Sequence, residues 1–477
     1  MKKSITRIIC FVFVLVLILS YTNYVFKPKY GDGIYDVTKF YKLEDNTVDV
    51  LILGSSHAFE DFNTGTLWSS YGIASYVLGG SIQPMWNTYY YLKEALKTQN
   101  PALIILEGYM TTYESEFIDD SRIIKNNYGL RWSEDKINAI KISTPEDRQR
   151  EFLLEYLQYH TRYTELSRDD FFKNRGNPLY KSWKGFGCNM AVTPTETVDV
   201  SSVTDRSELF GKTEEYYRKI IELAQEKGIP LLVVISPYAR IDEDDQAFFN
   251  TAADIAYEYD VSFINYNLLP DETGIDYFTD AADNDHLNHR GNQKFSKVVG
   301  AYITENYNIP DRRGEEKYLS WETNADYISA MICNQQLLET TDRDLIIEKL
   351  LNPNYCLFIT IDGECSTTEE DLGNLYMALG ISNEFEQGIW YRDNTAGIVW
   401  TSGEEEAEQY LRPDFHDICM RRVFEEDEEC YVNEVIIDNV ELKKVEDGVN
   451  ITVYDSITQS VVGCLGFNLD DPYNIVW

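Results

Sequence analysis

The stretch VDVLILGSSH, residues 48–57, decides the fold of this chain. Residues 48–53 form a mostly apolar run of strand length, and this run ends abruptly in a glycine and two serines. Apolar runs of this kind are typical of parallel strands that are buried on both faces. A serine on the sharp turn after such a strand projects its hydroxyl into the crevice where parallel sheets bind ligands. The stretch therefore predicts a buried parallel sheet with a reactive hydroxyl at its edge.

Similar strand-like runs alternate with helical patterns up to about residue 306. The strand-like runs are 76–78, 102–106, 229–236 and 262–265, and the helical patterns are 84–98, 213–227, 245–259 and 291–305. Strands and helices that alternate at this spacing predict an α/β fold, with a parallel sheet covered by helices on both faces. Residues 114–210 interrupt the alternation with helical patterns such as 133–142 and 145–158. We expect a helical insertion there, which either shapes the active-site edge or only packs against it.

A second polar stretch, DNDH at residues 283–286, complements the serine turn. Its spacing lets the Asp283 carboxylate hold the His286 ring in one tautomer, so that the other ring nitrogen can take a proton from a serine of the first stretch. Each motif alone is also compatible with a tight turn or a helix cap. In this order on an α/β pattern, they predict a nucleophile, a base and an orienting acid for ester cleavage or acyl transfer through an acyl-enzyme.

Three blocks of this chain resemble the SGNH/GDSL hydrolase superfamily, most of all its membrane-anchored bacterial branch of DltD-like and alginate O-acetylation proteins. The blocks are GSSH at 54–57, the Gly79-Gly80 pair, and DxxHLNxxG at 283–291. The resemblance covers about residues 46–306 and implies a three-layer α/β/α, flavodoxin-like parallel sheet. It also implies that Ser56, rather than Ser55, is the nucleophile. The backbone N–H groups of Ser56 and Gly79 are the implied oxyanion donors.

The chain departs from the superfamily pattern after the third strand-like run. That position usually carries an oxyanion-binding asparagine, whereas this chain has LEGY at 106–109. The loss of one such donor typically costs about a hundred- to a thousandfold in rate. Either a substitute such as Tyr109 or a backbone amide is needed, or the chemistry is slow or specialised. As residues that line the pocket we consider Ser55, His57, Gly80, Tyr109 and His160, with packing as the alternative for the two histidines.

A metal site is the alternative use of the second polar stretch. Asp283, Asp285, His286 and His289 lie within seven residues, and such side chains bind zinc or manganese. No other His or Cys cluster in this half of the chain completes a ligand set. We therefore expect no metal and no cofactor.

The N-terminus has the composition of a membrane segment. Lys2, Lys3 and Arg7 precede residues 8–26, an uncharged apolar stretch that spans about 28 Å as a helix, close to the ~30 Å hydrocarbon core of a bilayer. Residues 1–27 therefore predict a transmembrane signal-anchor with a cytoplasmic N-terminus and the remainder of the chain outside the cell. A cleaved signal peptide is the alternative, and it also implies export.

Length and charge limit the other possibilities. A chain of 477 residues exceeds one typical core, so we expect residues 28–310 and 352–477 to form separate domains joined by a helical connector over 311–351. The net charge of −38 excludes nucleic acid as a partner, because phosphate binding needs clustered Lys and Arg. Six of the eight cysteines lie beyond residue 330, and export leaves both disulfides and free thiols open.

The C-terminal region resembles the PANDER-like (interleukin-like EMT inducer) domain. The resemblance rests on NYCLFITI at 354–361 and GVNITVYD at 448–455. It implies a compact, β-rich α+β fold that binds carbohydrate in some members. Trp390 and Tyr391 either stack on sugar rings or pack in the core.

Together these patterns predict a membrane-anchored, extracytoplasmic serine esterase or O-acyltransferase. We expect it to add or remove acyl groups, acetyl above all, on cell-envelope or exported polysaccharide. Its expected partners are this polysaccharide or acyl-sugar substrate, the membrane, and a multi-spanning acyl exporter. The alternative is a non-catalytic cell-surface protein that binds glycan on a degenerate hydrolase fold.

Overall fold

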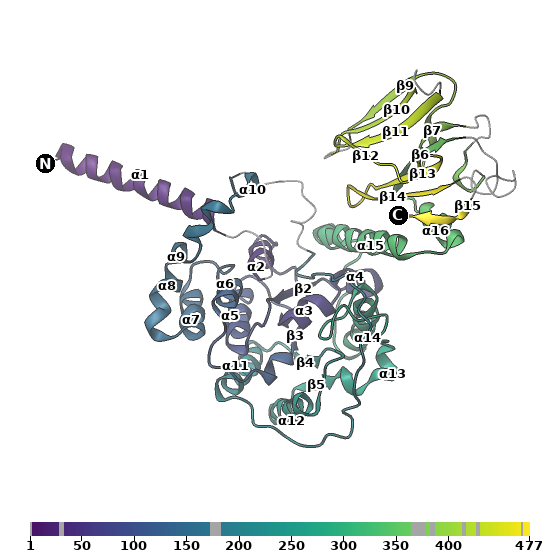
Figure 1. Cartoon of the computed structure of the whole chain (residues 1–477). Helices are drawn as coiled ribbons and strands as arrows, with labels where there is room; N and C mark the ends of the chain where they lie inside the picture. The colour runs from purple at the N-terminus through teal and green to yellow at the C-terminus, as the bar shows by residue number, and fades with distance from the viewer. Residues whose placement is uncertain are drawn as a thin grey trace. The chain divides into compact units, whose positions relative to one another are not determined.

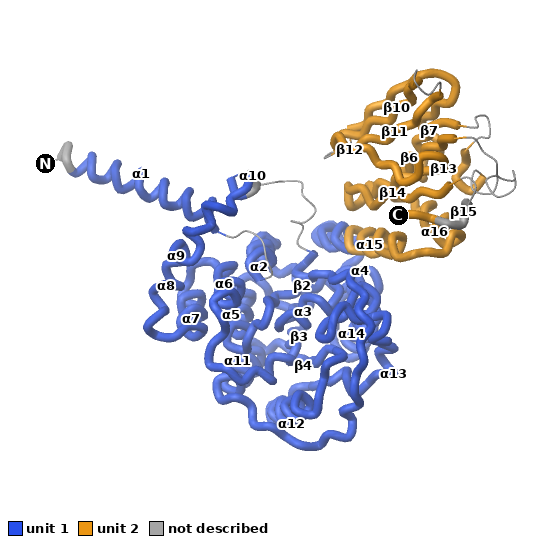
Figure 2. The backbone as a smooth tube through the Cα atoms, viewed as in Figure 1, with its two compact units in different colours: residues 1–325 blue, residues 326–477 orange. Residues whose placement is uncertain are grey.

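The structure is a computed structural model that describes residues 2–27, 33–171, 183–363, 377–381, 387–412, 416–425, 430–468 and 471–477. The chain divides into two compact units, Met1–Ala325 and Asp326–Trp477 (Figure 2). The boundary between them falls inside the long helix α15, Leu319–Glu339.

A five-stranded parallel sheet forms the centre of the first unit (Figure 1). Its strands are β1 (Val50–Gly54), β2 (Ser75–Gly79), β3 (Leu103–Glu107), β4 (Leu231–Ile235) and β5 (Ser262–Asn265). Their order is β2-β1-β3-β4-β5, as in flavodoxin-like folds. This order reverses direction between β1 and β3, and such a switch point is where open parallel sheets bind ligands. The predicted α/β fold is confirmed.

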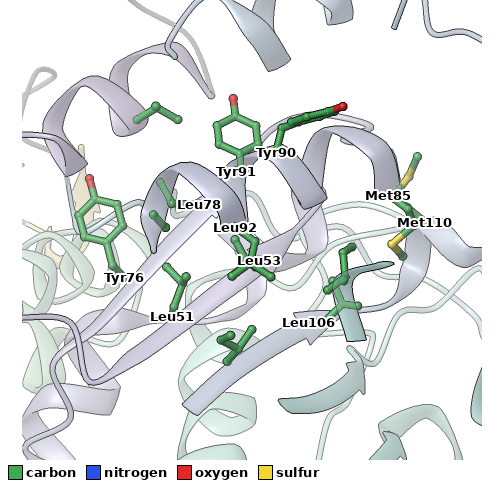
Figure 3. Packing of buried hydrophobic residues seen from close by; sticks show 14 of the residues in the cluster. Leu51, Leu53, Tyr76, Leu78, Met85, Tyr90, Tyr91, Leu92, Leu106 and Met110 are labelled. Carbon is green, nitrogen blue, oxygen red and sulfur yellow. The ribbon is translucent and has the colours of Figure 1, made fainter. Parts of the chain in front are cut away.

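Helices cover both faces of this sheet. They include α3 (Ser56–Asp61), α4 (Thr64–Tyr71), α5 (Met85–Ala95), α11 (Gly211–Lys227), α12 (Glu243–Glu258) and α14 (His289–Asn306). Because side chains alternate along a strand, Leu51 and Leu53 pack toward α5 and α11, whereas Val50 and Ile52 pack toward α4 and α14. Figure 3 shows the first of these cores. All five residues of β1 are buried, which explains why its sequence is apolar without alternation.

The predicted insertion contains short helices and a long irregular segment. The helices are α6 (Asp120–Asn127), α7 (Glu134–Ser143), α8 (Gln149–Leu153), α9 (Tyr156–Tyr159) and α10 (Arg168–Phe171). The helical pattern over residues 145–158 corresponds to a 3-10 turn at Glu146–Arg148 and to α8 and α9, with a break between these two helices. Leu154 has a ψ of 65°, outside the helical region, and it separates α8 from α9.

The chain begins with the apolar helix α1, Lys2–Phe26. Within the described residues, Ile5–Phe26 is the one helix long and apolar enough to cross a membrane. The short helix α2, Ile34–Phe40, follows.

The second unit combines helices with two antiparallel sheets, which confirms the predicted β-rich α+β fold. After α15 and α16 (Arg343–Leu350) come β6 (Tyr355–Asp362), β7 (Gly388–Asp393), β8 (Gly397–Ser402), β9 (Ala407–Leu411), β10 (Ile418–Glu425), β11 (Cys430–Ile437), β12 (Val440–Glu441), β13 (Gly448–Asp455), β14 (Ser460–Asn468) and β15 (Asp471–Val476). The sheets have the orders β15-β14-β13-β6-β7-β8 and β12-β11-β10-β9.

Aromatic side chains of this unit mostly serve its core. Trp390 is 1% exposed and packs in the hydrophobic core of the unit. Tyr391 stacks on Phe358, with ring centroids 5.2 Å apart. Trp390 therefore belongs to the core, whereas Tyr391 is half-buried at its edge. Among the described residues, free thiols include those of Cys10, Cys188, Cys333, Cys356, Cys419 and Cys464.

Candidate active site

The turn after β1 presents Ser56 at the edge of the sheet. β1 ends at Gly54, and α3 begins at Ser56 with Ser55 as its N-cap. Gly54 has no room for a side chain, because a Cβ atom there would lie 2.8 Å from the Cβ of Glu107 and 3.0 Å from that of Ala58. Ser55 is buried, whereas Ser56 is partly exposed. Of the two serines, only Ser56 therefore has its side chain open to a substrate.

The structure brings Ser56 together with the histidine and the aspartate that the sequence singled out. The Nε2 atom of His286 lies 2.8 Å from the Ser56 hydroxyl oxygen. The Nδ1 atom of His286 lies 3.0 and 3.1 Å from the two carboxylate oxygens of Asp283. With its proton on Nδ1, the ring donates to Asp283 and turns a lone pair toward the serine, which is the arrangement of a nucleophile with its base.

Asp283 also shapes the loop that carries His286. Its Oδ1 atom accepts hydrogen bonds from the backbone N–H groups of Asp285 and His286, at 2.8 and 2.9 Å. The same carboxylate therefore folds the turn and orients the ring. The N–H of Leu287 donates to the buried carboxylate of Asp61 in α3, at 3.0 Å, and this bond ties the loop to the helix that carries the serine.

Arg240, in the loop after β4, holds the other side of the same turn. Its guanidinium pairs with Asp285 at 2.8 Å, and its backbone N–H donates to the Asn284 carbonyl at 2.9 Å. The guanidinium also donates to the Tyr109 hydroxyl at 3.2 Å. The His286 loop is thus anchored to three elements, which fixes the ring relative to the sheet.

The charges around the ring favour a basic imidazole beside an ionised carboxylate. Burial acts to lower the pKa of His286, but the nearby carboxylates of Glu60, Asp61 and Asp283 outweigh it, and the pKa rises above its ordinary 6.5. Burial acts to raise the pKa of Asp283, but the N–H of Asp285 and the ring of His286 outweigh it, and the pKa falls below 3.8.

Two fully buried acids lie beneath the serine turn, and the sequence interpretation missed their importance. Burial raises the pKa of Glu107 to about 8 and that of Asp61 to about 7. Glu107 ends β3; its Oε1 atom accepts the N–H of Tyr109 at 2.9 Å, and its Oε2 atom lies 3.5 Å from the Ser55 hydroxyl. A carboxyl with this pKa is mostly protonated at pH 7 and can donate a hydrogen bond. The available signal was a glutamate at the end of an otherwise apolar strand.

The predicted oxyanion donors lie at the same sheet edge. Ser56 is the first residue of α3, so its N–H has no acceptor within the helix. Gly79 ends β2 opposite Gly54, and a Cβ there would lie 3.0 Å from the Gly54 and Ser55 carbonyl oxygens. A Cβ on Gly80 would lie 2.3 Å from the buried side-chain oxygen of Asn126. The close packing explains why Gly79 and Gly80 have no side chain. The role of the Ser56 and Gly79 N–H groups as oxyanion donors stays a prediction.

Of the two histidines predicted to line the pocket, His57 lies near His286 and His160 does not. The His57 ring lies 4.1 Å from that of Tyr109 and 5.1 Å from that of His286. Burial and the neighbouring His286 lower the pKa of His57 to about 3, so it is a neutral packing ring rather than a base. His160 is exposed and belongs to a 3-10 turn beside α1, where its Nδ1 atom lies 2.8 Å from the Leu157 carbonyl. The structure does not bring His160 to Ser56.

The geometry gives no support to the alternative metal site. Asp283 is bonded to His286, and Asp285 is paired with Arg240. His289 is fully buried in the first turn of α14. In the described part of the chain, no group of three or more His, Cys, Asp or Glu side chains is arranged to hold a metal ion.

Comparison with known proteins does not assign the chain to a family. No protein-family model matches it, and no curated protein does. One similar solved structure is a protein of Bacteroides fragilis NCTC 9343 with a provisional acylhydrolase assignment; it is 10% identical, with a TM-score of 0.28 over 57% of this chain and 94% of that one. Another is a gut microbial diltiazem-metabolizing enzyme, 13% identical, with a TM-score of 0.20 over 55% of this chain and 47% of that one. At these TM-scores the function must be inferred from the site itself.

Proposed function

We propose that the first unit is an SGNH-type serine esterase or O-acyltransferase, with Ser56 as its nucleophile. The observation that carries this proposal is the 2.8 Å approach of His286 Nε2 to the Ser56 hydroxyl, with the Asp283 carboxylate behind the ring. A solvent-accessible serine, a basic imidazole and an ionised carboxylate are the three parts that acyl transfer requires.

The chemistry proceeds through an acyl-enzyme. His286 takes the proton of Ser56 as the hydroxyl oxygen attacks the carbonyl carbon of an ester, and the resulting imidazolium is stabilised by Asp283. The tetrahedral oxyanion is bound by the N–H groups of Ser56 and Gly79. His286 then gives its proton to the leaving alkoxide. Water or a sugar hydroxyl, deprotonated by His286, attacks the acyl-enzyme and restores Ser56.

Contacts of α1 favour a permanent signal-anchor over a cleaved signal peptide. Val25 is 3% exposed, and the Phe26 carbonyl accepts a hydrogen bond from Arg162 at 2.6 Å. Lys27 pairs with Glu155 at 3.1 Å. Cleavage near this end of the helix would remove part of the packing of the first unit. The retained helix supports a single-pass protein with its N-terminus in the cytoplasm and its catalytic unit outside.

We infer from this location that the substrate is an acylated cell-envelope or exported polysaccharide. An anchored enzyme meets a polymer at the same surface, and a multi-spanning acyl exporter would supply the donor in a transfer reaction. In this proposal the chain is a member of the DltD-like and alginate O-acetylation branch of the SGNH superfamily, and its second unit is a PANDER-like domain.

The test uses the full chain purified in detergent, with p-nitrophenyl acetate as the acyl donor. The proposal expects hydrolysis by the unchanged protein and loss of activity in Ser56→Ala and in His286→Ala. Equal rates in all three proteins would contradict an enzyme and favour a glycan-binding protein. Glycan oligomers that accelerate donor consumption and become acylated identify a transferase, whereas hydrolysis at an unchanged rate identifies an esterase.

A further inference from the structure

Five apolar side chains of the insertion stand exposed beside the helix α1. Leu154 is 61% exposed, Leu157 is 49% exposed and Tyr163 is 69% exposed. Tyr156 and Phe171 are also exposed. We call these five residues the apolar collar. Large apolar groups that gather on a surface mark an interaction site more often than scattered ones do.

The collar belongs to the elements on which α1 rests. α1 contacts α9, α10 and the 3-10 turn His160–Thr164. The rings of Phe26 and Tyr156 lie 5.9 Å apart, and the Tyr159 hydroxyl is hydrogen-bonded to Asn23. Figure 1 shows α1 leaving the unit beside α9 and α10. The collar therefore lies on and beside the elements that α1 contacts where it leaves the folded unit.

The exposure of α1 changes at the same point. Residues 5–21 are exposed on every side of the helix, whereas Val25 is buried against the insertion. The bare stretch is about 26 Å long at 1.5 Å per residue, close to the ~30 Å hydrocarbon core of a bilayer. If this stretch lies in lipid, the collar lies at the level of the headgroups. Tyrosine rings and leucines on short amphipathic helices are the side chains found at that level.

We propose that the apolar collar inserts into the outer interfacial layer of the membrane and forms a second lipid contact besides α1. This inference rests on the part of the proposed function that makes α1 a membrane anchor. Lipid is the occupant that fits, because residues 5–21 of α1 are bare around the whole helix, and the end of the same helix contacts the elements that carry the collar. With two contacts the catalytic unit is held at a fixed tilt, so that it acts on substrate close to the membrane surface.

Photolabelling in a bilayer tests the collar and the anchor separately. The full chain is reconstituted in phosphatidylcholine vesicles that contain a diazirine phospholipid, irradiated, and mapped by peptide mass spectrometry. We expect label on α1 and on the peptide over residues 150–171. Peptides with Tyr257 and Phe278, which are 61% and 58% exposed elsewhere on the unit, serve as controls and should remain unlabelled. Label on α1 alone would overturn the collar and leave the anchor standing; label on neither would overturn both.

A charge-introducing variant provides the second test. In Leu157→Asp/Tyr163→Asp, labelling of residues 150–171 should fall to the level of the control peptides, while labelling of α1 and the thermal unfolding midpoint stay unchanged. The matched variant Tyr257→Asp/Phe278→Asp adds the same charge at equally exposed sites and should not change the labelling pattern. Unchanged labelling of residues 150–171 in the first variant would contradict insertion of the collar.

Discussion

The hydroxyl of Ser56 and the Nε2 atom of His286 lie 2.8 Å apart, although 230 positions separate the two residues along the chain. The serine follows the strand β1, and the histidine lies in a loop that is anchored to α3 through the Leu287–Asp61 hydrogen bond. Formation of the parallel sheet brings the serine turn and the histidine loop to the same edge.

Replacement of either partner should abolish ester hydrolysis. In enzymes that use this arrangement, loss of the serine or the histidine costs at least ~10³-fold in kcat, because no other group supplies the nucleophile or its base. We expect the same loss in Ser56→Ala and His286→Ala, measured with p-nitrophenyl acetate, at an unchanged thermal midpoint. Ser55→Ala is the matched control, because Ser55 is buried beneath the turn. If Ser55→Ala were as inactive as Ser56→Ala, the assignment of Ser56 as the nucleophile would be contradicted.

Asp283→Asn should reduce activity far more than Asp285→Asn. Asp283 accepts the imidazole N–H and two backbone N–H groups, whereas Asp285 pairs with Arg240 away from the ring. An amide in place of the orienting carboxylate favours the wrong tautomer and lowers kcat by up to about 10⁴-fold in a comparable site. A loss of about 10²-fold or more is expected here, and under tenfold for Asp285→Asn, measured as kcat at saturating ester. Similar losses in both variants would assign Asp283 only a role in folding the loop.

The rate should fall as the pH decreases, with a midpoint above 6.5. The base works only as the neutral imidazole, and the surrounding carboxylates raise the pKa of His286 above that ordinary value. Burial raises the pKa of Glu60 to about 7, so this carboxyl carries part of a charge near the midpoint; Glu60→Gln removes it, and the midpoint of kcat/KM should move modestly to lower pH. Glu226→Gln, an exposed glutamate on α11, is the control and should leave the profile in place. An unshifted midpoint in Glu60→Gln would show that this carboxyl does not act on the ring.

Glu107 should make the folded protein more stable in mild acid than in base. Its pKa rises from 4.5 to about 8 on folding, so its contribution to stability is complete below pH 4.5 and is lost as the pH rises through 8. This rise in the pKa of Glu107 should lower the free energy of unfolding by at least about 1 kcal/mol between pH 5 and 8. Glu107→Gln carries no titrating proton, so its thermal midpoint should change less over this range. Parallel pH dependences for the two proteins would show that Glu107 is ionised in the folded state.

Much of the fold followed from local pattern. The strand β5 has the predicted bounds, 262–265, and the other four strands of the sheet lie within about two residues of their predicted limits. Apolar runs identify these strands because a parallel strand covered by helices on both faces is built mostly of apolar residues. The helical pattern over 145–158 did not reveal the break after α8, because a hydrophobic pattern cannot show that Leu154 leaves the helical conformation.

The sequence by itself determined the chemistry that was available: a serine after a buried strand, an aspartate three residues before a histidine, and an apolar helix at the N-terminus. Only the tertiary structure decided which groups meet. It placed His160 beside α1 rather than at the serine, and it buried Glu107 and Asp61 under the turn. The physical reason is that composition and spacing report on the conformation of a few neighbouring residues. By contrast, burial depends on segments that are distant in the sequence and come together only in the folded sheet. The pKa changes that burial causes depend on the same segments.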